Sequence, residues 1–148
     1  MMQTQTAPFA STLDSLIDAG FVHAGRWTKF AFESELDLDK PGVYAFVVDG
    51  AVNYIGKTDR SLAARFRSHR RRAEDAEADL RRPVHFRLAE DIYGGRTVEI
   101  YVLLCAGQLT MWRGLPVDVL SGLEAALIRQ FDPPYNRASR ARVSRLAA

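Results

Sequence analysis

Two tyrosines lie in a segment that is typical of a β-hairpin. Tyr44 ends the run Gly42-Val43-Tyr44, and Tyr54 begins the run Tyr54-Ile55-Gly56-Lys57. Two phenolic oxygens at one site, together with a fixed cation and a carboxylate able to bind a metal, suit the attack of water on a phosphodiester. The polar residues that could complete such a site follow later in the chain: Arg65, His69, Glu124 and Asn136.

The requirements of phosphodiester hydrolysis each have a candidate here. Arg65 offers a planar fork for a phosphate, and Glu124 offers a ligand for Mg²⁺, which often binds through one or two carboxylates plus waters and substrate phosphate. Tyr44 could take a proton from water, but the ordinary tyrosine pKa of ~10 is too high for an efficient base at neutral pH. A neighbouring cation must lower that pKa, or another group must share the work.

The register of the hairpin decides whether the tyrosines meet. Strands are expected at 43–48 and 51–55, joined by a tight turn. A two-residue turn puts Tyr44 and Tyr54 on opposite faces, whereas a three-residue loop at 48–50 places them directly opposite each other on one face. We predict the second register, because only it builds a joint site.

Apolar periodicity and turn residues indicate the other elements. Residues 21–40 and 108–115 read as mostly irregular chain. Helices are expected at about 11–19, 62–80 and 122–131, the last starting as early as 116, and strands at about 28–32, 84–88 and 97–105. On the second helix Arg65 and His69 are four residues apart, so they share one side.

Each candidate also has a purely structural interpretation. Strand tyrosines usually just pack on a pleated surface, and Arg65 and His69 could be ordinary helix residues. Ser121-x-x-Glu124 fits a capping box, in which the carboxylate only satisfies a helix end. Asn136 follows two prolines and could simply close a turn.

Composition fits one globular domain. The chain has 148 residues, 47% of them hydrophobic, and a net charge of +2. Arginine far outnumbers lysine and gathers at 65–72 and 137–145, a local pattern that suits phosphate contacts. No apolar run approaches the ~20 residues that span a bilayer, and we expect neither a signal peptide nor a membrane partner. The single cysteine, Cys105, is expected to be a buried thiol, and the location cytoplasmic.

Taken together, the motifs resemble the GIY-YIG nuclease superfamily. Gly42-Val43-Tyr44 and Tyr54-Ile55-Gly56-Lys57-Thr58 are similar to its paired signature, with Val43 in place of the first isoleucine. The resemblance spans residues 41–137 and continues through three more motifs: Leu62-x-x-Arg65-x-Arg67-x-His69, Leu123-Glu124-x-x-Leu127-Ile128 and Pro133-Pro134-Tyr135-Asn136. The turn after Gly56 is one residue longer than in many members, so Arg67 and Arg60 are alternatives for the role of Arg65.

The resemblance implies an α+β fold, with a small antiparallel or mixed sheet of about three strands flanked by helices. It implies that Tyr44 is the general base or orients water and that Tyr54 contacts water or phosphate. Arg65 would stabilise the transition state, and His69 could accept the tyrosine proton. The remaining implied roles are metal binding (Mg²⁺ or Mn²⁺) by Glu124 alone, support of the site by Asn136, and substrate contacts by Lys57, Arg67 and Arg70.

We therefore expect a divalent-metal-dependent endonuclease that acts on DNA. Residues 1–40 would be an N-terminal extension packed on the domain, 41–137 the nuclease domain, and 138–148 a basic tail. Three alternatives stay open: a non-catalytic nucleic-acid-binding module of the same fold, a nuclease acting on RNA, and a structural domain with the tyrosines in its core. A homodimer could cut both strands of a duplex.

Overall fold

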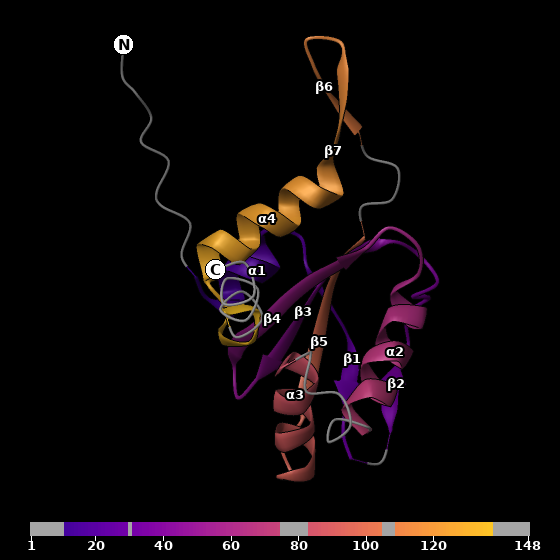
Figure 1. Ribbon diagram of the computed structural model, residues 1–148, viewed down its shortest axis with the longest axis vertical. Coiled ribbons are helices and arrows are strands. Elements are labelled where there is room, and N and C mark those ends of the chain that lie inside the picture. Colours follow the sequence, from indigo (N-terminus) through magenta and orange to yellow (C-terminus); the bar gives the residue numbers. More distant parts are fainter. Residues whose placement is uncertain (1–10, 30, 75–82, 105–108, 138–148) are drawn as a thin grey trace, which may run out of the picture.

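The computed structural model describes residues 11–29, 31–74, 83–104 and 109–137 (Figure 1). Helices and strands are mixed along this part of the chain. In order they are α1 (Leu13–Asp18), β1 (Val22–Trp27), β2 (Phe32–Ser34), β3 (Gly42–Val48), β4 (Ala51–Thr58), α2 (Leu62–Glu74), α3 (Pro83–Tyr93), β5 (Val98–Leu104), β6 (Leu109–Trp112), β7 (Leu115–Asp118) and α4 (Val119–Phe131).

A five-stranded antiparallel sheet in the order β2-β1-β5-β3-β4 forms the centre of the molecule. Every residue of β3 is buried, because β3 lies between β4 and β5 and helices cover both of its faces. The α+β class is confirmed, with five strands in this sheet instead of about three. The extra strands, β1 and β2, come from residues 21–40, where we expected irregular chain with a short strand at 28–32.

Helices cover the two faces of the sheet, as Figure 1 shows: α2 and α3 lie on one side, α1 and α4 on the other. The residues of β3 alternate between the two cores. Tyr44 and Phe46 pack with Phe66 of α2 and Leu88 of α3. Val43 and Ala45 pack with residues of the opposite layer, including Leu16, Leu120 and Leu127. The two motif tyrosines therefore belong to the α2–α3 side.

Two segments differ from the sequence-based expectation. The strand expected at 84–88 is wrong, because the segment belongs to α3. Val84, Leu88 and Ile92 recur four residues apart and are all buried, which is the period of a helix face. The loop expected at 108–115 is also wrong, because β6 and β7 form a hairpin. Arg113 and Gly114 make its turn with φ of 48° and 83°, as a tight hairpin turn requires.

Other boundaries follow the expectation closely. Thr12 caps α1 through Ser15 N–H, and Gly20 follows the helix with φ of 106°. Helix α2 is described as far as Glu74, and its expected continuation to residue 80 lies outside the described residues. The same is true of the expectations for residues 1–10, Cys105 and residues 138–148. Within the described chain, none of the helices is both long and apolar enough to cross a membrane.

Candidate active site

The hairpin of β3 and β4 brings the tyrosines together by a route that we did not expect. Its turn is the two-residue one, with Asp49 and Gly50 at φ of 51° and 76° and Val48 paired with Ala51. A bulge then shifts the register, so that Phe46, not Tyr44, pairs with Tyr54. The predicted three-residue loop and direct pairing are wrong. The shared face is confirmed, because the bulge reverses the alternation of β4 and leaves the two rings 6.1 Å apart.

Gly56 lies directly across from Tyr44. A Cβ built on Gly56 would be 2.5 Å from the Tyr44 hydroxyl and 2.6 Å from the ring carbon that carries it. The phenol therefore lies over the glycine backbone, at a distance that any side chain would prevent. This close approach gives the glycine of the second motif a physical reason: it makes the space in which the Tyr44 hydroxyl rests.

Tyr44 is a core residue, only 2% exposed. Its hydroxyl lies 2.7 Å from Nε2 of His69, and Phe66 packs edge-on against its ring at 5.2 Å. Burial, followed by the nearby Tyr54, raises the Tyr44 pKa well above its usual value of 10.0, although the Arg65 charge opposes this. A cation therefore does not make Tyr44 a base by itself. A second group must receive its proton, and His69 is in contact.

His69 lies in the middle of a line of three side chains. It is 5% exposed, and its second ring nitrogen, Nδ1, is 3.0 Å from Nε2 of His85 on α3. Phe46 holds the His69 ring edge-on at 5.2 Å. Sequence reasoning missed His85, because the strand expected at 84–88 placed it in another element. The helical period of Val84, Leu88 and Ile92 is the signal that could have put it beside α2.

Glu124 reaches the free edge of β4 from α4. It accepts a hydrogen bond from the backbone N–H of Lys57, and burial raises its pKa while the charges of Lys57 and Arg65 lower it. The capping-box interpretation is wrong. Asp118 caps α4, accepting from Leu120 N–H at 3.0 Å and from the Ser121 hydroxyl at 2.9 Å. Glu124 lies in the second turn of the helix, so its carboxylate is not used to end it.

Asn136 holds the edge of β4 two residues before Lys57. Its side-chain oxygen accepts from Ile55 N–H and its side-chain nitrogen donates to Ile55 C=O, both at 2.9 Å. The preceding Tyr135 donates a hydrogen bond to buried Asp91 on α3. The segment after α4 is thereby joined to the sheet edge on one side and to the α3 layer on the other.

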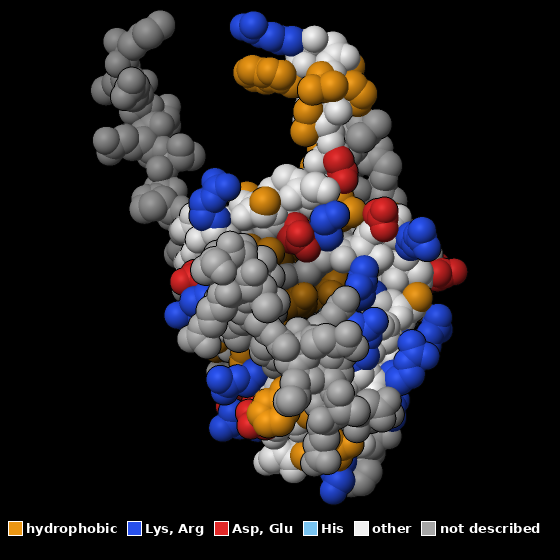
Figure 2. Space-filling model, viewed as in Figure 1, with side chains coloured by type: hydrophobic (Ala, Val, Ile, Leu, Met, Phe, Trp, Pro, Cys, Tyr) orange, Lys and Arg blue, Asp and Glu red, His pale blue; other side chains and the backbone are white. Residues whose placement is uncertain are grey.

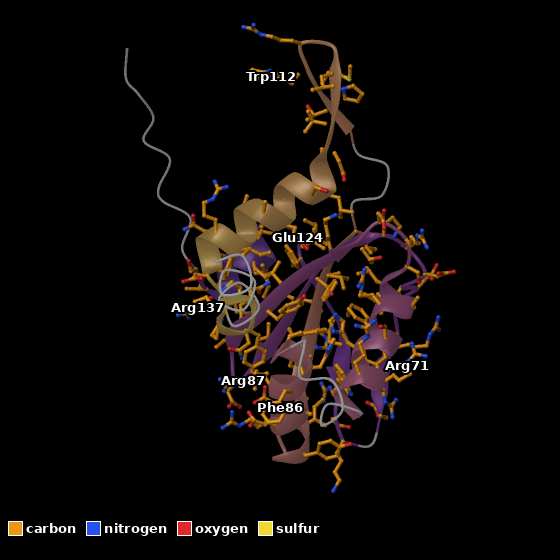
Figure 3. All side chains as sticks on the ribbon, viewed as in Figure 1. Arg71, Phe86, Arg87, Trp112, Glu124 and Arg137 are labelled. Atoms are coloured by element: carbon orange, nitrogen blue, oxygen red, sulfur yellow. The ribbon has the colours of Figure 1, made fainter. Side chains whose placement is uncertain are left out.

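The Tyr44 hydroxyl contacts His69, and the nearby Tyr54, Arg65 and Glu124 all act on its pKa. Arg65 acts on the pKa of both Tyr44 and Glu124, and Lys57 acts on that of Glu124. Figure 2 shows a hollow on this face, with hydrophobic side chains at its floor and Lys and Arg side chains along its α2 side. Figure 3 places Glu124 on α4, above the sheet. This arrangement can hold an anion beside a carboxylate.

The other basic candidates lie elsewhere. Arg60 and Arg67 are exposed, and Arg70 lines a small cavity with Trp27 and Tyr93. None of the three is among the charges that shift the pKa of Tyr44 or Glu124. Arg65 is therefore the arginine that the fold brings to the tyrosines.

The donor set at Glu124 is compatible with a hard divalent cation. No group of three or more His, Cys, Asp or Glu side chains in the described chain could hold a metal. A carboxylate has about four acceptor positions, however, so the bond from Lys57 leaves room for a cation that binds through one carboxylate, waters and phosphate. Glu124 fits such a cation and does not fit a closed cage of protein ligands.

Comparison with solved structures shows the same fold in a phage protein. A point mutant of bacteriophage T4 EndoII matches with a TM-score of 0.65 at 16% identity, over 84% of this chain and 97% of the other. The GIY-YIG endonuclease domain of Thermotoga maritima UvrC, bound to magnesium as its catalytic divalent cation, matches at 0.43 with 26% identity over 68% and 86% of the two chains. A restriction endonuclease in complex with product DNA matches at 0.46 with 13% identity over 88% and 91%.

Comparisons of sequence gave no match. No family model and no curated protein matches this chain. The likeness to T4 EndoII is a likeness of fold, and at this level of identity it carries no residue roles. The chain therefore shares its fold with T4 EndoII. The two motifs noted in the sequence, at residues 42–44 and 54–58, lie on the paired strands β3 and β4.

Proposed function

We propose that the protein is a divalent-metal-dependent endonuclease that hydrolyses phosphodiester bonds in DNA. The observation that carries the proposal is the convergence of a phenol–imidazole pair, Tyr44 and His69, with Arg65 and Glu124 near one hydroxyl, and with Lys57 beside Glu124. A protein that only bound nucleic acid would need the cations. It would have no need of a buried phenol in contact with a histidine.

The proton removed from the attacking water passes through the two tyrosines to His69. Tyr54 is half-buried and Tyr44 is buried, so Tyr54 is the phenol that meets a water at the surface. One O–H bond of that water breaks as its proton passes to the Tyr54 oxygen, the Tyr54 proton passes to Tyr44, with which Tyr54 shares a hydrogen bond, and the Tyr44 proton moves to Nε2 of His69. The hydroxide formed attacks phosphorus, and the bond from phosphorus to the leaving oxygen breaks. His69 ends the step as the protonated base, which solves the problem of a phenol that is too weak an acid to ionise alone.

The charged groups act on the phosphate. Arg65 presents a fixed cation to the phosphoryl oxygens, on which negative charge builds up in the transition state. Lys57 lies beside Glu124, where a leaving oxygen would be stabilised. Glu124 would hold Mg²⁺ or Mn²⁺, which supplies Lewis-acid stabilisation of phosphate oxygens when bound. The half-buried position of Glu124 strengthens these interactions relative to water.

The experiment is a cleavage assay with matched variants. Supercoiled plasmid, single-stranded DNA and RNA are each incubated with purified protein and Mg²⁺, Mn²⁺ or EDTA. We expect nicking or linearisation of plasmid that EDTA abolishes. Glu124→Gln should remove cleavage, and Arg65→Ala should cost about 2.7–4 kcal/mol of transition-state stabilisation.

Controls on the same helix make the result specific. Arg71 is exposed on α2 (Figure 3) and is not among the charges acting on Tyr44 or Glu124, so Arg71→Ala should cleave almost as well as the parent protein. Equal losses in Arg65→Ala and Arg71→Ala would mean that general charge, not the site, is being measured. Salt-sensitive binding without cleavage under any condition would favour a binding module. Cleavage confined to RNA would mean that the substrate is RNA and not DNA.

A further inference from the structure

His85 is a buried histidine that has no role in the proposed reaction. It is 1% exposed on α3, and its ring centroid lies 5.0 Å from that of His69, at an angle of 56°. The contacts Tyr44 Oη to His69 Nε2 (2.7 Å) and His69 Nδ1 to His85 Nε2 (3.0 Å) connect the three side chains. A continuous line of hydrogen bonds therefore runs from β3 through α2 to α3.

Such a line has two directions when both rings are neutral. In the first, Tyr44 donates to His69 Nε2, so that the His69 hydrogen is on Nδ1 and is donated to His85 Nε2. In the second, His85 Nε2 donates to His69 Nδ1, and His69 Nε2–H points at Tyr44. Only the first direction leaves His69 Nε2 able to receive a proton from Tyr44.

We propose that His85 is a positioning residue that accepts the Nδ1–H of His69 and so keeps His69 Nε2 open for the Tyr44 proton. The inference rests on the proposed function. In the step itself the Tyr44 O–H bond breaks and a His69 Nε2–H bond forms, which makes His69 an imidazolium. The bond from Nδ1–H to His85 then stabilises the new charge in a place that water does not reach, as an orienting group does for a catalytic histidine elsewhere.

The surroundings of His85 support a polar role. Its neighbours on the inner face of α3 are the apolar residues Val84, Leu88 and Ala89, all buried, so packing alone would be served by another apolar side chain. Tyr44 is a phenol whose burial favours the protonated form, and a buried O–H needs an acceptor. His69 Nε2 lies 2.7 Å from the Tyr44 hydroxyl, so the Tyr44 end of the line favours the direction that starts at Tyr44.

The tautomer of His69 can be measured without any substrate. The chain has three histidines, and the third, His23, is exposed and pairs with Glu99, so the spectrum of ¹⁵N-histidine-labelled protein is simple to assign with His85→Gln and His23→Gln. In neutral His69 we expect a protonated Nδ1 and an unprotonated Nε2. A neutral His69 protonated at Nε2 would overturn the proposal.

Two substitutions of His85 separate hydrogen bonding from packing. His85→Leu fills the space without an acceptor, and we expect cleavage to fall about 10–100-fold as the Nε2–H tautomer of His69 appears. His85→Gln puts an amide oxygen where Nε2 lies, and it should restore most of that cleavage together with the Nδ1–H tautomer. Phe86→Leu, at an exposed site one residue away (Figure 3), is the matched control and should behave like the parent protein.

The outcomes are distinct from those of the cleavage assay. Unchanged cleavage and an unchanged His69 tautomer in folded His85→Leu would refute the proposal. If His85→Leu does not fold, the His69 tautomer in the parent protein and the cleavage by His85→Gln still test the proposal. If the parent protein cleaves no nucleic acid, the proposed function fails, and the NMR measurement alone tests the direction of the line.

Discussion

The side chain of Asn136 pairs with the backbone of Ile55 as a neighbouring strand would. It accepts from the N–H and donates to the C=O, both at 2.9 Å, and it is 8% exposed. Strand β4 is at the edge of the sheet, where unpaired backbone groups are otherwise left to solvent. One amide therefore satisfies the edge next to Lys57, whose own N–H is bonded by Glu124.

Asn136→Ala should lower both stability and activity. It leaves two buried backbone groups of Ile55 without these partners, which should cost about 1–3 kcal/mol of unfolding free energy, measured by urea denaturation. Cleavage should fall as well, since Lys57 loses its fixed position. Arg137→Ala is the control, because the Arg137 side chain forms an exposed ion pair with Asp132 at 3.5 Å, a kind of contact worth ~0–1 kcal/mol. Equal effects from the two variants would refute the special role of Asn136.

Gly56→Ala should inactivate the site through Tyr44. The new methyl group would lie 2.5 Å from the Tyr44 hydroxyl, so the phenol must move, and a misplacement of about 1 Å can cost on the order of 100-fold in rate. We expect the overpacking to cost ~1–3 kcal/mol of stability, measured by thermal denaturation alongside cleavage. Gly122→Ala, on α4, where the added carbon would face open space beyond the backbone of its own helix, should cleave normally. Full activity in Gly56→Ala would show that Tyr44 does not act from this position.

The motifs predicted the local elements of the site better than its three-dimensional detail. The paired strands, the helix that carries Arg65 and His69, and the helix that carries Glu124 can each be expected from apolar periodicity and turn residues. The register of β3 and β4 could not be predicted, because the sequence is compatible with both a two-residue turn and a longer loop. The turn took the first form, and a bulge restored the shared face, a combination that alternation alone does not reveal.

Segments whose apolar pattern is incomplete were harder to predict. Val84–Leu88 is too short to separate a strand from a helix by periodicity alone, and the error hid His85. The hairpin of β6 and β7 leaves Met111, Trp112 and Leu115 more than half exposed, so it lacks the buried face by which strands are usually recognised. The pKa of Tyr44 depends on burial by α2 and β4 together, which no local pattern reports.

Glu124→Gln should make the protein more stable and inactive. Burial raises the Glu124 pKa in the folded state above its usual value of 4.5. The stability that the protonated carboxyl contributes is therefore fully present below pH 4.5, and it is lost as the pH rises through the higher pKa of the folded state. At neutral pH the carboxylate is therefore a net cost. Glutamine keeps an acceptor for Lys57 N–H without the charge. Urea unfolding should show a gain near neutral pH that vanishes at acidic pH. Glu90→Gln on exposed α3 surface should show neither the gain nor the loss of cleavage.

Tyr44→Phe should lower the rate of cleavage. It should also make the protein lose less stability at high pH than the parent protein does. The Tyr44 pKa is raised well above 10.0 by burial, so above about pH 10 the unfolded chain releases this proton while the folded protein keeps it. Stability present at lower pH is then lost as pH rises, by up to about 1.4 kcal/mol per pH unit from one group. Urea midpoints at about pH 8 and about pH 11 should therefore fall further in the parent protein than in Tyr44→Phe. Cleavage at neutral pH should drop about 10²–10⁴-fold, the usual contribution of general acid–base catalysis. Parallel falls in the two midpoints would mean that Tyr44 ionises as readily in the folded chain as in the unfolded one, and its proton could then leave without His69.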